Sequence, residues 1–184
     1  MPHITLPDRP GIRALFNASP ETAKPLCELA ETLLGPTSQT LPGSTLTRGE
    51  RELIAAFVSS RNACRYCTGS HSAYAAAQLP GGRAEVEAVK HDVATADLSA
   101  KLRALLSIAD YVQDSGKAVT TDAVAAARKA GATDRDIHDT VLIAAAFCMY
   151  NRYVDGLGTI PLADERGYDA MADHIVANGY ANLK

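Results

Sequence analysis

The chain has 184 residues, a length that suits one domain or two closely fused halves. Its 18 basic and 21 acidic residues are interspersed and give a net charge of −3, which argues against nucleic acid as a partner. No apolar run reaches the roughly 18 residues that a membrane-spanning helix needs, and the first ten residues lack the pattern of a signal peptide. We therefore expect a cytoplasmic protein that binds neither nucleic acid nor a membrane.

Prolines are frequent near the start of the chain, at positions 2, 7, 10 and 20. Proline fixes φ and removes an amide donor, so we expect residues 1–19 to form an extended N-terminal arm that lies over the rest of the molecule. Residues 20–184 are then expected to form a single helical domain.

The remaining sequence predicts helices throughout. A first helix begins at Pro20 and stops at Gly35-Pro36. Thr47, with Glu50 three residues later, forms a capping box ahead of a very apolar stretch, which predicts a buried helix. Capping residues and apolar residues at helical spacing predict further helices over 64–79, 83–95, 98–115, 121–129, 133–152 and 162–177. No stretch alternates as a strand does, so the expected fold class is all-α, a compact multi-helix bundle.

Two of these helices are similar to each other. Residues 47–57 and 133–147 both run from a capped start through charged residues into Ile-Ala-Ala and then Phe. Two explanations fit the pattern: an internal helical duplication, or two core helices of similar composition.

The residues with the clearest chemistry lie between positions 62 and 71. On a helix, Cys64, Cys67 and His71 share one face, because about 3.6 residues make a turn. Cysteines near a helix N-terminus are exposed to the positive end of its dipole, which favours the reactive thiolate, and an imidazole at i+4 can take a thiol proton. In a reducing compartment, such a pair indicates catalysis or metal binding rather than a structural disulfide.

Other interpretations of this cluster stay open. The cysteines could be inert core residues, since free cysteine is among the most buried residue types. A zinc site is the sharper alternative, with four available ligands: Cys64, Cys67, His71 and Glu52. Structural zinc sites, however, usually take their ligands as two short pairs from loops. By spacing alone, Glu52 is a solvated first-turn residue and stands out no more than Glu50.

The same four residues match, position for position, the motif of the alkylhydroperoxidase D and carboxymuconolactone decarboxylase superfamily. That motif is a glutamate, eleven residues, CxxC, three residues and a histidine; here its members are Glu52, Cys64, Cys67 and His71. The chain also resembles the peroxidase-related branch of this superfamily over 46–54 and 151–158, so that the resemblance covers about residues 10–165.

This resemblance implies an all-helical fold of the alkylhydroperoxidase D type and homo-oligomers, usually trimers or hexamers. It implies a thiol-dependent hydroperoxidase or disulfide reductase with a proton relay. In this relay Glu52 orients or charges His71, and His71 exchanges a proton with a cysteine. The implied partners are a hydroperoxide or disulfide substrate and a reducing thiol, either a protein or a small molecule; no cofactor or metal is expected. The helix terminus favours Cys64 as the attacking thiol, whereas the i+4 contact with His71 favours Cys67. Of these two alternatives, we expect Cys67 to attack and Cys64 to resolve.

Two further residues are candidates for the surroundings of the active centre. Tyr66 stands where alkylhydroperoxidase D itself has a histidine directly before the second cysteine, which is the one departure from that enzyme. His138 lies near the start of a predicted core helix. Cys27 and Cys148 lie on apolar helix faces and are expected to be core residues.

Two alternative functions remain. One is a carboxymuconolactone decarboxylase-like enzyme, whose reaction does not require a cysteine pair. The other is a non-enzymatic redox sensor or zinc-binding protein that uses the same cluster.

Overall fold

The computed structural model describes residues 1–181 and 183, with the side chains of 39 and 40 left out. Within this part of the chain all regular structure is helical, which confirms the predicted fold class. The helices are α1 (Ile12–Ala18), α2 (Pro20–Leu34), α3 (Arg48–Arg61), α4 (Arg65–Ala76), α5 (Gly82–His91), α6 (Ala100–Asp114), α7 (Thr121–Lys129), α8 (Asp134–Gly156) and α9 (Glu165–Asn178), with 3-10 turns η1 (Pro36–Thr40) and η2 (Gly116–Ala118). None of the described helices combines the length and apolar character needed to cross a bilayer.

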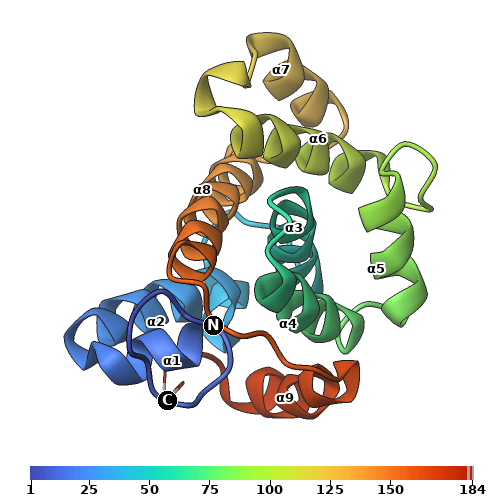
Figure 1. Cartoon of the computed structure of the whole chain (residues 1–184). Helices are drawn as coiled ribbons and strands as arrows, with labels where there is room; N and C mark the ends of the chain where they lie inside the picture. Colours follow the sequence, from blue (N-terminus) through green and yellow to red (C-terminus); the bar gives the residue numbers. More distant parts are fainter. Residues whose placement is uncertain (182, 184) are drawn as a thin grey trace.

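Helix α3 lies in the middle of the molecule, and the other helices are arranged around it (Figure 1). Helix α4 packs along α3, and α2, α5, α6 and α8 contact its other sides. Every residue from Arg51 to Ser59 is buried, as the apolar sequence of this helix predicts. The centre of the fold therefore carries the helix that holds Glu52.

The predicted capping box begins α3, and a second capping box, which was not predicted from the sequence, begins α8. The Thr47 hydroxyl accepts a hydrogen bond from the Glu50 amide, and the Glu50 carboxylate accepts one from the Thr47 amide; Thr133 and Asp136 repeat the arrangement at α8. Asp136 also accepts hydrogen bonds from the Thr45 amide and hydroxyl, at 2.6 and 2.7 Å. It therefore ties the loop before α3 to the start of α8.

The N-terminal segment differs from the extended arm that the prolines predict. Residues 12–18 form α1, because Ala14, Leu15 and Phe16 are buried where this segment contacts α2 and α8. The part before α1 lies over the rest of the chain, as predicted: its His3 amide donates a hydrogen bond to the Leu157 carbonyl at 3.0 Å.

Several helix ends differ from the predicted ones by a few residues. Helix α4 begins at Arg65 with Cys64 as its N-cap, and α7 is capped by Thr120 rather than Thr121. Helix α9 begins after Asp164, whose carboxylate accepts a hydrogen bond from the Arg166 amide. These ends depend on which nearby side chain caps the helix, so spacing alone places them only to within a few residues.

Candidate active site

A sharp turn between α3 and α4 brings the two cysteines to a helix N-terminus. Ala63 in this turn has a φ of 57°, a left-handed conformation that a residue with a Cβ seldom adopts and that costs free energy. The chain then enters α4 with Cys64 at the N-cap and Cys67 in the first turn. Both cysteines therefore lie at the positive end of the α4 dipole, and His71 follows Cys67 by one turn.

Both cysteines are free and buried, with exposed fractions of 0% for Cys64 and 4% for Cys67. The hydrogen bond to Cys64 and burial raise the pKa of the Cys67 thiol well above its usual value, while a hydrogen bond from Asn151 acts in the opposite direction. The Asn151 amide is itself held in place, since it donates to the Ser59 hydroxyl at 3.1 Å. Cys67 is thus a protonated thiol at neutral pH, and it needs a base to become a nucleophile.

Glu52 is fully buried, not the solvated first-turn residue that its position suggests. One of its carboxylate oxygens, Oε2, lies 2.7 Å from Nδ1 of His71. The other, Oε1, accepts a hydrogen bond of 2.5 Å from the hydroxyl of Tyr180. A buried carboxylate is tolerated only when such partners compensate for its lost hydration.

These contacts define the protonation of His71. An ionised carboxylate can only accept hydrogen bonds, so Nδ1 of His71 is the protonated ring nitrogen and Nε2 is the basic one. No direct hydrogen bond joins His71 to either Cys64 or Cys67 in the described part of the chain. Proton transfer between imidazole and thiol therefore requires a bridging molecule or a small side-chain shift.

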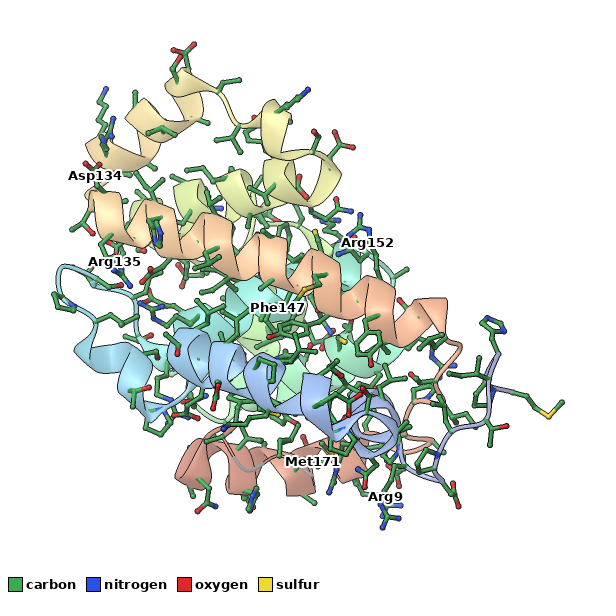
Figure 2. The ribbon with its side chains drawn as sticks, turned by 90° about the vertical axis from the view of Figure 1, so that its left-hand side faces the viewer. Arg9, Asp134, Arg135, Phe147, Arg152 and Met171 are labelled. Atoms are coloured by element: carbon green, nitrogen blue, oxygen red, sulfur yellow. The ribbon has the colours of Figure 1, made fainter. Side chains whose placement is uncertain are left out.

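Cys67 and His71 line one cavity, which has a volume of about 50 Å³. The walls come from α1, α2, α4, α8 and the segment after α9, and they are rich in aromatic rings: Phe16, Tyr66, Tyr74, Phe147, Tyr150 and Tyr180. Phe147, on α8 (Figure 2), packs edge-on against His71 with ring centroids 4.5 Å apart. Of the residues that the structure describes, no Lys, Arg, Asp or Glu lines the cavity, so it is suited to an apolar ligand.

Of the two additional candidates, the structure brings only Tyr66 to this cavity. Tyr66 is buried, and burial raises the pKa of its hydroxyl, so it keeps its proton at neutral pH and does not act as a base. His138 has a side chain that is 60% exposed, and its Nδ1 lies 3.0 Å from the Asp139 carboxylate. It precedes Asn151 by thirteen residues of α8, or about 20 Å of helix, and it does not line the cavity.

The zinc alternative requires several donors around one point. Among the described residues, no group of three or more His, Cys, Asp or Glu side chains has an arrangement that could hold a metal ion. Both Glu52 oxygens are instead engaged by His71 and Tyr180. The ligand set that the sequence suggests is therefore not assembled around a common centre.

Sequence reasoning missed Tyr180 and Asn151. Tyr180 lies 128 residues from Glu52, and no motif or spacing connects the two. Asn151 falls in a segment that resembles the peroxidase-related branch, but only the fold shows that its side-chain amide forms a hydrogen bond with Cys67.

Comparisons with known proteins give this chain a family and two structural relatives. The model of the carboxymuconolactone decarboxylase family matches residues 20–111. A solved structure described as an alkylhydroperoxidase AhpD core, an uncharacterized peroxidase-related protein from Ralstonia eutropha JMP134, is 26% identical, with a TM-score of 0.73 and coverage of 89% of this chain and 80% of that one. An uncharacterized peroxidase-related protein from Silicibacter sp. TM1040 is 28% identical, with a TM-score of 0.74 and coverage of 87% and 78%. The search of curated proteins found no significant match.

Proposed function

The chain belongs to the carboxymuconolactone decarboxylase family, and we propose that it is a thiol-dependent hydroperoxide reductase with Cys64 and Cys67 as its redox dithiol. The observation that carries this proposal is the cavity that Cys67 shares with His71, whose imidazole is hydrogen-bonded to the buried Glu52. The similarity to two peroxidase-related structures supports it. A disulfide could be reduced by the same dithiol.

In the proposed reaction, Nε2 of His71 takes the proton of Cys67, directly or through a bridging molecule. The thiolate attacks the terminal oxygen of the hydroperoxide, the O–O bond breaks, and the alcohol leaves with the proton that His71 returns. Cys67 is now a sulfenic acid. The sulfur of Cys64 displaces its oxygen as water, which forms the disulfide, so the two thiols supply the two electrons of the reduction. A reducing thiol partner then restores both by exchange.

The assignment of roles follows from access. Cys67 lines the cavity, whereas Cys64 is fully buried and is not part of the cavity wall. A substrate in the cavity therefore meets Cys67 first. Because the walls are aromatic and aliphatic, we expect an apolar hydroperoxide to react faster than hydrogen peroxide.

The test is to follow thiols and hydroperoxide together. One equivalent of cumene hydroperoxide should remove two thiols at once, and mass spectrometry should place the disulfide between Cys64 and Cys67. Cys67→Ser should reduce hydroperoxide at least about 100-fold more slowly, while Cys64→Ser should stop at a trappable sulfenic acid. Cys148→Ser is the matched control, since this thiol lies outside the cavity near the Gln113 carbonyl. Wild-type rates in both active-site variants would rule the proposal out.

The alternatives give different results in the same preparation. A lactone acid brings a carboxylate, and no lysine or arginine among the described residues lines the cavity to bind it, so the geometry favours hydroperoxide reduction over decarboxylation. Release of carbon dioxide from a lactone acid without thiol loss would support the decarboxylase. A metal content of about one zinc per chain would support the zinc-binding protein.

A further inference from the structure

The segment that follows α9 reaches back into the centre of the site. The Tyr180 side chain is buried, and its hydroxyl donates the 2.5 Å hydrogen bond to Oε1 of Glu52. Its ring lies nearly parallel to that of His71, with an interplanar angle of 14° and centroids 6.2 Å apart. The ring also meets Tyr74 edge-on, at a centroid distance of 6.3 Å. Tyr180 therefore contacts both members of the Glu52–His71 pair, although it lies outside the stretch that the family model matches.

A carboxylate on α2 holds this segment in place. Oε2 of Glu31 accepts a hydrogen bond of 2.6 Å from the Tyr180 amide. The Glu31 carboxyl group lies against two glycines: a Cβ at Gly35 would come within 2.3 Å of it, and one at Gly179 within 2.2 Å. Gly179 also has a φ of +70°, which side chains disfavour. We call this contact between Glu31 and the 179–180 backbone the Glu31 latch.

We propose that Tyr180 is a positioning residue: its hydroxyl holds the Glu52 carboxylate so that the other oxygen faces Nδ1 of His71, and the Glu31 latch keeps Tyr180 in place. The proposal rests on the function proposed above, in which His71 takes the proton of Cys67.

The physical reason is that Glu52 is isolated from water. In an apolar interior, a carboxylate oxygen without a donor costs free energy, and a carboxylate held at one oxygen only can rotate away from the imidazole. Burial and the charge of Glu52 raise the pKa of Tyr180 well above its usual value. The phenol therefore stays protonated and remains a donor to Glu52 at any pH at which the enzyme would work.

The test compares Tyr180→Phe with Tyr168→Phe. Tyr168 is a matched control because it is also buried, but its hydroxyl accepts a hydrogen bond from the Leu162 amide and does not contact the relay. Alkylation of Cys67 by iodoacetamide, followed by mass spectrometry across pH, measures the relay without any hydroperoxide. Reduction of cumene hydroperoxide is measured beside it, with kcat and KM separated.

We expect Tyr180→Phe to slow both reactions by about tenfold near neutral pH, since a charge-assisted hydrogen bond to the relay is lost. The loss should appear in kcat with KM unchanged, because the phenyl ring keeps its place in the cavity wall. The acid limb of both profiles should move to higher pH, because the charged form of Glu52 loses a donor. Tyr168→Phe should keep the wild-type profile.

A second comparison covers the case in which Tyr180→Phe does not fold, as judged by circular dichroism. Glu31→Ala leaves the phenol intact and removes the latch, so it should move the acid limb in the same direction.

In a Glu52→Gln background, Tyr180→Phe should have no further effect, because residues that act as one unit are not additive.

The outcomes separate the two proposals. If the alkylation profile responds to Tyr180→Phe while no hydroperoxide is consumed, the positioning role holds and the proposed function fails. If hydroperoxide is reduced but neither Tyr180→Phe nor Glu31→Ala changes the pH profile, the positioning role is overturned and the proposed function stands.

Discussion

A fully buried carboxylate determines the orientation and the proton positions of the groups that hydrogen-bond to it. Glu52 has two such partners, His71 and Tyr180. Glu52→Gln keeps the size of the side chain but gives it an amide. That amide can donate to Nδ1 of His71, which would move the ring proton to Nε2 and remove the base that faces the cavity. We expect the variant to fold and still form the disulfide, but to reduce hydroperoxide at least about tenfold more slowly near neutral pH.

His71→Ala should slow hydroperoxide reduction by a similar factor. The double variant should be only slightly slower than either single variant, because the two residues act as one unit. The matched control is Glu50→Gln on the same helix, since glutamine retains the capping box that Glu50 makes with Thr47. A steady-state pH–rate profile checks all four proteins. An unchanged profile for Glu52→Gln would mean that Glu52 is a structural residue of α3.

At the scale of the helices, Asp136 makes a contribution to the free energy of unfolding that depends on pH. Burial alone would raise the pKa of Asp136, but hydrogen bonds from Thr45 and Thr133 outweigh it and lower the pKa from 3.8 to about 2. Above pH 3.8 the carboxylate is ionised in folded and unfolded chains, so its contribution is complete. As the pH falls toward about 2 the unfolded chain binds the proton first, and the contribution is lost.

Asp136→Asn should therefore lower the free energy of unfolding by about 1–2 kcal/mol at neutral pH. Urea unfolding at pH 7, 4 and 3 should show the difference between wild type and variant shrinking below about pH 4. Asp134→Asn is the control in the same helical turn; its side chain is exposed and pairs only with the exposed Arg128, so it should change stability by less than about 0.5 kcal/mol. A difference that stays constant between pH 7 and pH 3 would show that the Asp136 charge does not contribute.

The features predicted from sequence are those that local residues determine. Thr47 and Thr133 were identified as helix starts because a helix cap is made by residues close together in the sequence, and the cysteine–histidine spacing puts three groups on one face in any helix. Helix α1 was missed because its few apolar residues become helical only when α2 and α8 cover them. Tyr180 was missed for the same reason, since only the folded chain brings it to Glu52.

For the whole molecule, both ends of the chain complete the cavity. The walls include residues of α1 at one end and Tyr180 and Leu183 at the other, beside the central α4. In Figure 1 α1 and the segment after α9 lie on the lower side of the molecule, below α8. The CxxC helix alone therefore does not form the site, and its aromatic walls come from distant parts of the sequence.

The outer surface of α8 is unusually apolar for an exposed helix. Leu142, Ala145 and Met149 are exposed and recur at helical spacing, and Tyr153 continues the same row. Met149 and Tyr153 also line a groove against Pro25 of α2. Figure 2 shows this side of the molecule, with α8 crossing it above α2.

We propose that this row of α8 residues is buried between copies of the chain in a homo-oligomer, a trimer or a hexamer, because exposed apolar rows of this kind mark association surfaces. Light scattering at micromolar concentration should give the mass of such an assembly. Met149→Glu should shift it to smaller species, because a carboxylate buried at an apolar contact without a partner costs several kcal/mol. Ile160→Glu is the control: this residue is also exposed and apolar but lies beyond the end of α8, so the mass should not change. A monomeric wild-type chain, or equal dissociation by both variants, would contradict the assignment of this surface.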